Sequence, residues 1–105
     1  MRPIHVARLD KARPVLVLTR DIVRPHMNTV TVAPITTTIR GLSTEVPVGP
    51  ANGLNDRGVV ACDHVTTIPT KVLGPRVGQL LEDQETTLTS AIHAAFDLEG
   101  GLVYR

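Results

Sequence analysis

The chain has 105 residues and a mass of 11.3 kDa, which excludes a two-domain enzyme because chains usually divide only above about 150 to 250 residues. Hydrophobic residues make up 42% and charged residues 20%, so the composition suits a packed core and excludes an intrinsically disordered chain. Aromatic residues make up only 2%, which excludes RNA modules that stack bases on several aromatic side chains. We expect a single domain over residues 1–105.

The net charge of +1 conceals an uneven distribution of charged side chains. The first 41 residues contain seven Lys and Arg against two Asp, whereas residues 82–99 contain five acidic residues and no Lys or Arg. This segregation indicates an anionic ligand on the first half of the chain. The excess of Arg over Lys suits phosphate recognition, but it also fits a genome that favours Arg codons.

The first residues and the cysteine content bear on location and on metal binding. Arg2, Arg8 and Asp10 interrupt the first ten residues, which therefore lack the apolar core of a signal peptide. No segment approaches the roughly 18 apolar residues of a membrane span. The single cysteine, Cys62, excludes an internal disulfide and a multi-thiolate zinc site. We expect a cytoplasmic protein without membrane contact, cofactor or metal.

Roughly a third of the residues are Val, Ile or Thr, which favour strands over helices. Alternating apolar residues and turn signals predict strands at residues 4–9, 14–19, 29–35, 42–48 and 59–63, and a shorter extended piece at 65–73. The first two strands are joined by a short hairpin over residues 10–13. Residues 14–19 form an apolar run that predicts burial on both faces, and Pro47 favours an edge position for its strand.

The connections and the end of the chain follow different patterns. Residues 21–28 read as a connection with one helical turn, and residues 49–58 are rich in turn formers. Near the end, apolar residues recur at helical spacing: Leu88, Ala91, Ile92, Ala95 and Phe96. This spacing predicts an amphipathic helix over residues 83–97, closed by Gly100 and Gly101. We expect a mainly β fold, a strongly bent antiparallel sheet or partly open barrel, covered by one C-terminal helix.

Three segments carry a resemblance to a known family. They are Arg13-Pro14 followed by VLVLTR, the strand end from Pro34 to Thr38 (PITTT), and the segment from Val60 to Ile68 (VACDHVTTI). Their order and spacing resemble the MazF/PemK family of toxin endoribonucleases, over about residues 4–96. The mycobacterial and other actinobacterial members are most similar.

The resemblance implies an SH3-like small barrel, related to that of the CcdB toxins, which forms a homodimer and binds single-stranded RNA across the interface. It implies a toxin of a type II toxin–antitoxin system that inhibits translation and growth by cutting messenger, ribosomal or transfer RNA at short sequences. In that family the 2'-hydroxyl attacks its own phosphate without a metal, leaving a 2',3'-cyclic phosphate and a 5'-hydroxyl. The partner would be a cognate antitoxin with an acidic, flexible tail.

The family motifs place catalytic roles on Arg13, Thr36 and Asp10. A guanidinium can meet two phosphate oxygens as charge develops on them, and a threonine hydroxyl is a neutral donor to the same group. The hairpin that carries Asp10 and Arg13 is shorter than the loop usual in the family. Substrate binding is assigned to six further polar residues: Thr37, Thr38, Arg40, Asp63, His64 and Arg20.

The general base remains open among Asp10, Asp63 and His64. Asp63 can equally cap a turn or hold Arg13, and His64 can be a rim residue. Two other functions are compatible with the same fold: a CcdB-like gyrase-binding toxin and a non-catalytic RNA-binding barrel. The pairing of Arg13 with Thr36 and the absence of a C-terminal Trp favour the ribonuclease.

Overall fold

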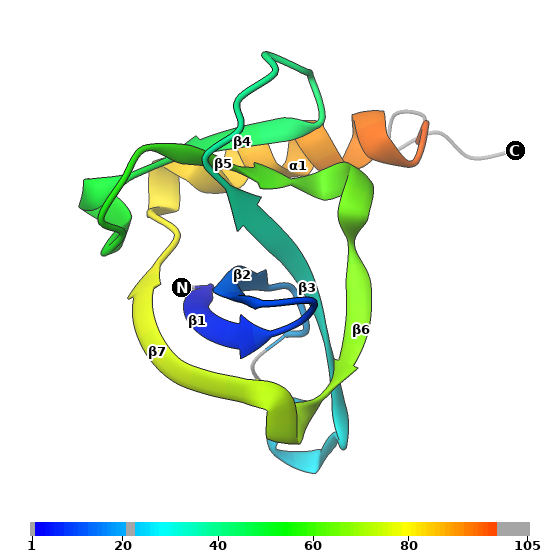
Figure 1. The fold of residues 1–105 in the computed structure, drawn as a ribbon. Coiled ribbons are helices and arrows are strands. Elements are labelled where there is room, and N and C mark those ends of the chain that lie inside the picture. The colour runs from blue at the N-terminus through cyan, green and yellow to red at the C-terminus, as the bar shows by residue number, and fades with distance from the viewer. Residues whose placement is uncertain (1, 21–22, 99–105) are drawn as a thin grey trace, which may run out of the picture.

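The structure is a computed structural model that describes residues 2–20 and 23–98 (Figure 1). The described strands and helix are β1 (Pro3–Arg8), β2 (Ala12–Val17), β3 (Thr29–Thr36), β4 (Glu45–Val48), β5 (Gly58–Ala61), β6 (Thr66–Pro69), β7 (Leu73–Gln79) and α1 (Glu85–Ala95). Single 3-10 turns separate several of them: η1 (Arg24–His26), η2 (Pro50–Asn52), η3 (Cys62–His64), η4 (Thr70–Val72) and η5 (Glu82–Gln84). The predicted mainly β fold with one C-terminal helix is confirmed.

The strands form one bent antiparallel sheet in the order β4-β5-β3-β2-β1-β7, with β6 also paired to β3. The long strand β3 crosses the molecule diagonally in Figure 1 and serves both ends of the sheet. Its first half, Thr29 to Val32, pairs with β6, and Ile35 and Thr36 pair with β5. Among the described strands no ladder joins β4 to β7, so the sheet is strongly bent and open rather than a closed barrel.

The bend gives the sheet two hydrophobic cores, one on each side of β2. Val15 and Val17 contribute to one core and Leu16 to the other, and none of the three exposes any surface. The predicted burial of this strand on both faces is therefore confirmed. On the Leu16 side the core is closed by α1, which packs against β4 through Leu88 and Ala91 (Figure 1).

The first hairpin is tighter than the sequence indicates. The strand β2 begins at Ala12, and Arg13 pairs with Ala7 inside the ladder, so the predicted hairpin over residues 10–13 is wrong at its second end. The main chain turns instead at residues 9–11, where the N–H of Leu9 donates to the carbonyl of Lys11. Strand pairing therefore fixes the backbone of Arg13.

Other boundaries also differ from the predictions: the first strand ends at Arg8 instead of at residue 9, and the second ends at Val17 instead of at residue 19. The strand predicted at 42–48 begins only at Glu45, and that predicted at 59–63 ends at Ala61, after which η3 turns the chain. The extended piece predicted at 65–73 is β6 followed by η4. As predicted, β4 is an edge strand. Proline has no backbone N–H to donate to a neighbouring strand, and an edge position tolerates this at Pro47.

The strand β7 has no counterpart in the predictions because Gly74, Pro75 and Gly78 interrupt its apolar pattern. As the other edge strand, it pairs only with β1, with register shifts, so proline and glycine are tolerated there.

The predicted helix over 83–97 is a 3-10 turn followed by α1, which ends at Ala95. Phe96 follows the helix and is 56% exposed, so it does not belong to the buried face. Gly100 and Gly101, predicted as the helix stop, lie outside the described residues. In the part of the chain that is described, no helix is both long enough and apolar enough to span a membrane.

Candidate active site

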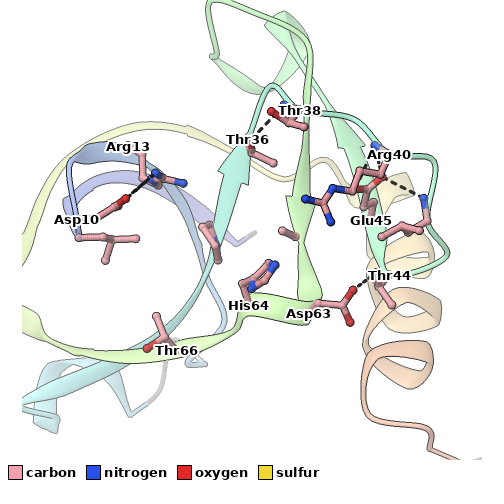
Figure 2. A pocket seen from close by; sticks show the side chains of 14 residues that line it. Asp10, Arg13, Thr36, Thr38, Arg40, Thr44, Glu45, Asp63, His64 and Thr66 are labelled. Carbon is pink, nitrogen blue, oxygen red and sulfur yellow. Dashed lines mark hydrogen bonds and ion pairs between the residues drawn. The ribbon is translucent and has the colours of Figure 1, made fainter.

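A pocket of about 440 Å³ opens where four segments of the chain meet (Figure 2). The segments are the first hairpin, the end of β3, the loop of residues 37–44 between β3 and β4, and the turn η3 with the start of β6. We call this space the site pocket. Seven of the nine residues assigned from the sequence line it: Asp10, Arg13, Thr36, Thr38, Arg40, Asp63 and His64.

Arg13 is held on one wall of the site pocket by Asp10. Its Nη2 lies 3.2 Å from Oδ1 and 3.3 Å from Oδ2 of Asp10, and the carboxylate also accepts the N–H of Lys11 at 3.0 Å. The side chain of Arg13 is only 25% exposed. Its Nε is buried and makes no hydrogen bond to any described residue. Because the Nε has almost no accessible surface, the terminal nitrogens of the guanidinium are the donors that can reach an anion in the site pocket.

Thr36 ends β3 between the guanidinium groups of Arg13 and Arg40 (Figure 2). Its Oγ1 accepts the backbone N–H of Thr38 at 3.1 Å. Because the oxygen is used as an acceptor, the O–H proton of Thr36 remains available as a donor. The hydroxyl of Thr36, which lines the site pocket, can therefore donate to an anion there.

Asp63 and His64 lie on the same turn but in different surroundings. The Oδ2 of Asp63 accepts the hydroxyl of Thr44 at 2.6 Å, which ties η3 to the 37–44 loop. Figure 2 shows His64 projecting toward the middle of the site pocket, opposite Thr36. No hydrogen bond or ion pair joins its imidazole to another described residue. The structure thus gives Asp63 a structural contact and leaves His64 facing the open space.

Cys62 precedes these two residues and points into the core. The thiol is free and 1% exposed, and its burial, assisted by the charge of Asp63, raises the pKa to about 11. A thiol that stays protonated is a poor nucleophile, so Cys62 packs rather than reacts. Within the described ranges no three His, Cys, Asp or Glu side chains are grouped to hold a metal ion.

Two of the assigned residues do not line the site pocket. Arg20 lines a different depression together with Arg2, Glu82 and Glu85. Thr37 is exposed just beyond β3 and is absent from the lining. Of the seven basic residues in the first 41, two line the site pocket (Arg13 and Arg40) and two line this second depression (Arg2 and Arg20), a difference that a count along the sequence could not show.

Sequence reasoning missed Thr44 and Glu45, which also line the site pocket. The carboxylate of Glu45 accepts the backbone N–H groups of Arg40, Gly41 and Leu42 at 2.9 to 3.3 Å. This capture of amides explains why residues 42–44 form a turn instead of the start of β4. No local sequence signal marks Glu45, because its partners are backbone amides of the preceding loop.

The chain is similar to known proteins along nearly its whole length. The family model described as PemK-like, MazF-like toxin of type II toxin-antitoxin system matches residues 4–96. Endoribonuclease MazF3 of Mycobacterium tuberculosis is 64% identical over 99 residues, covering 94% of this chain and 96% of the relative.

Solved structures give the same picture. The Mycobacterium tuberculosis toxin MazF-mt6 superposes with a TM-score of 0.93 at 63% identity, covering 94% of this chain and all of that one. An endoribonuclease in complex with its cognate antitoxin, from a mycobacterial species, superposes with a TM-score of 0.84 at 25% identity, covering 93% of this chain and 94% of that one.

Proposed function

The chain belongs to the PemK-like, MazF-like toxins of type II toxin–antitoxin systems, and on this premise we propose that it is an endoribonuclease that cuts single-stranded RNA in the site pocket. Similarity to the MazF3 endoribonuclease supports the activity, because it extends over nearly the whole of both chains. Which RNA is cut in the cell, whether messenger, ribosomal or transfer RNA, depends on the base sequence that the site pocket accepts.

The observation that carries the proposal is the pair of donors formed by Arg13 and Thr36. Both side chains line one pocket, Arg13 with a guanidinium held by Asp10 and Thr36 with a hydroxyl proton free to donate. Donors that are already oriented stabilise the charge that develops on phosphate oxygens in the transition state. A gyrase-binding toxin does not need this arrangement, and cleavage of RNA distinguishes the proposal from a passive RNA-binding barrel.

We place the scissile phosphate between Arg13 and Thr36. The adjacent 2'-oxygen attacks phosphorus and loses its proton to a base, while the bond from phosphorus to the 5'-oxygen breaks. The departing 5'-oxygen takes up a proton from solvent water, so the products are a 2',3'-cyclic phosphate and a 5'-hydroxyl. No step requires a metal ion, because Arg13 supplies the positive charge. Asp10 acts through Arg13 by holding its guanidinium.

His64 is our choice for the group that accepts the 2'-hydroxyl proton. Of the three candidates, Asp10 is engaged by Arg13 and Asp63 by Thr44. Only the imidazole of His64 projects into the site pocket without a hydrogen bond to a described residue (Figure 2). Histidine is also the side chain that enzymes most often use for this purpose.

The partners follow from the family and from the surface. A mycobacterial relative is known in complex with its cognate antitoxin, and we propose such a partner here, with an acidic, flexible tail that competes with RNA for Arg13 and Arg40. We also propose a homodimer. An apolar groove beside α1 exposes Phe96 and Leu98 to about half of their surface, and a second copy would cover them.

The test is to incubate the purified chain with mixed single-stranded RNA in excess EDTA and to sequence the new 5'-hydroxyl ends. The proposal predicts cleavage at a short recurring sequence with 2',3'-cyclic phosphate on the upstream fragments. Intact RNA, or activity that appears only when magnesium is restored, would overturn the mechanism. DNA gyrase inhibition without RNA cleavage would favour the CcdB-like alternative.

A further inference from the structure

The 37–44 loop folds around a single carboxylate. Glu45 Oε1 accepts the N–H groups of Arg40 at 3.2 Å, Gly41 at 2.9 Å and Leu42 at 3.1 Å, and Oε2 accepts that of Arg40 at 3.3 Å. Successive amides that converge on one anion form a nest, and such a concavity requires an unusual backbone. Gly41 supplies it with a φ of +73°, in the left-handed region that glycine adopts without strain.

The carboxylate that holds this loop is itself anchored to the sheet. Glu45 is the first residue of β4 and pairs with Ala61 of β5, and its own N–H donates to the carbonyl of Leu42 at 3.1 Å. The neighbouring Thr44 accepts the N–H of Cys62 at 3.0 Å through its carbonyl. The loop is thereby fixed relative to η3, which forms another wall of the site pocket.

Arg40 is the cationic side chain of this fixed loop. Figure 2 shows its guanidinium pointing from the loop toward the middle of the site pocket, on the opposite side from Arg13. The side chain is exposed, and it takes part in neither of the ion pairs found among the described residues. Arg40 is thus available to an anion, and its direction is set by the backbone that Glu45 holds.

We propose that Glu45 is a positioning residue for RNA binding: by gathering the amides of residues 40–42 it directs Arg40 to a second phosphate of the strand whose scissile phosphate lies at Arg13. The inference rests on the proposed function, since RNA is the ligand. Glu45 itself touches no RNA and acts through the loop.

Because Glu45 is negatively charged, a positioning role and simple electrostatic repulsion predict opposite changes in RNA affinity when its side chain is removed. A carboxylate beside an RNA pocket repels phosphates, so its removal by itself should strengthen RNA binding. If instead Glu45 positions Arg40, its removal should weaken binding despite the lost repulsion. A role limited to stability predicts no loss of affinity in the fraction of protein that is folded.

The experiment measures the affinity of a non-cleavable probe, a random-sequence pool of short 2'-fluoro single-stranded RNA, over a series of salt concentrations. The variants are Glu45→Ala, Glu45→Gln, Arg40→Ala and the double variant Arg40→Ala with Glu45→Ala. Glu82→Ala is the matched control, because Glu82 is exposed and lies in a different depression. Thermal unfolding confirms that each variant is folded, and Glu45→Gln, which keeps an acceptor oxygen, replaces Glu45→Ala if that variant does not fold.

We expect Arg40→Ala and Glu45→Ala each to weaken binding by about tenfold, the scale of a charge-assisted contact. Each should reduce the salt slope by about 0.7, the value for one lost phosphate contact on a single strand. The double variant should bind no more weakly than Arg40→Ala, because both changes remove the same contact. Glu45→Gln should fall between wild type and Glu45→Ala, and Glu82→Ala should match wild type.

Equal or tighter binding by Glu45→Ala, or additive losses in the double variant, would overturn the role of Glu45. Those results would leave the proposed function intact as long as the wild type binds the probe and cuts natural RNA. Failure of the wild type to bind any probe would refute the proposed function, and this inference with it. Binding without cleavage would refute only the proposed catalysis.

Discussion

At the scale of single residues, hydrogen bonds to neighbouring groups distinguish residues of the same type that the sequence alone leaves equivalent. Asp10 and Asp63 are both exposed acids of the site pocket, yet one carboxylate holds Arg13 and the other receives the hydroxyl of Thr44. Thr36 differs from the other strand threonines because its oxygen accepts the N–H of Thr38. These contacts are the basis of our proposal that His64 takes the proton from RNA.

Replacing His64 by Ala should lower RNA cleavage by about a hundred- to ten-thousandfold, the range for losing a general base. The affinity for non-cleavable RNA should change little, because a base acts on the proton and not on the phosphate. His26→Ala is the matched control, since His26 is an exposed histidine outside the site pocket. Single-turnover cleavage rates provide the measurement. If the His64 variant cuts RNA at the rate of the control, His64 is not the general base, and Asp10 or Asp63 takes that role.

Cys62 predicts how stability depends on alkaline pH. Burial raises the pKa of its thiol from 9.0 to about 11, so above about pH 9 the unfolded chain releases a proton that the folded chain keeps. The unfolded state is thereby favoured, and the free energy of unfolding should fall as pH rises from about 9 to 11, by at most about 1.4 kcal/mol per pH unit. Urea unfolding of wild type and Cys62→Ala across this window measures the difference. Identical pH slopes for the two proteins would show that the thiol contributes nothing.

Only the site residues that belong to local sequence motifs could be predicted. Arg13 and Thr36 follow recognisable patterns, and the fold brings both to one pocket. Arg20 shares the basic character of the first half of the chain, but it lies in another depression because β2 has ended before it. Glu45 was missed because its role depends on the path of the loop before it, and an acidic residue at one position does not predict that path.

At the scale of elements, a buried polar cluster joins three parts of the chain that are distant in sequence. Asn52 is 2% exposed, and its Nδ2 donates to the carbonyl of Gln79 at 3.0 Å and to Gln84 Oε1 at 2.6 Å. Its Oδ1 accepts the N–H of Gly49 at 3.0 Å. A Cβ at Gly78 would collide with the carbonyl oxygen of Asn52, so only glycine allows this close approach. The cluster connects η2, the end of β7 and the start of α1.

Asn52→Ala should lower the free energy of unfolding by about 2 to 3 kcal/mol, because it leaves the groups around it buried without partners. Asn55→Ala, an exposed change in the same connecting segment, should have almost no effect. Urea denaturation of the two variants gives the comparison. Equal stability of the two variants would mean that water or local rearrangement replaces the lost hydrogen bonds.

The elements were predictable where their periodicity is strong. Burial within the strand predicted at residues 14–19 is correct for Val15 to Val17, although the strand is Ala12–Val17, and the helix face of Leu88 and Ala91 is correct, because apolar spacing reflects burial directly. The strand β7 was not predictable, since its glycines and Pro75 are accommodated by an edge position that only the assembled sheet defines. The early start of β2 likewise depends on pairing of Ala12 with Arg8.

At the scale of the whole molecule, the open sheet and the short helix leave apolar surface exposed. The groove beside α1 is lined by Leu88 and Ile92, with Phe96 and Leu98 at its edge. We predict that the chain is a homodimer at micromolar concentration, and light scattering should give about twice the mass of 11.3 kDa. Phe96→Asp should shift the mass toward that of one chain if this groove lies in the interface. A single-chain mass for the wild type across this range would contradict a dimer.

The proposed cleavage depends most on Arg13, which we propose binds the phosphate at which RNA is cut. The most direct measurement compares the single-turnover cleavage of single-stranded RNA in excess EDTA by wild type, Arg13→Ala and Arg57→Ala, an exposed arginine that does not line the site pocket. We predict that Arg13→Ala folds normally but cuts about a hundred to a thousand times more slowly, the loss expected for one oriented donor, while Arg57→Ala matches wild type. Cleavage by Arg13→Ala at the rate of the Arg57 variant would contradict the account.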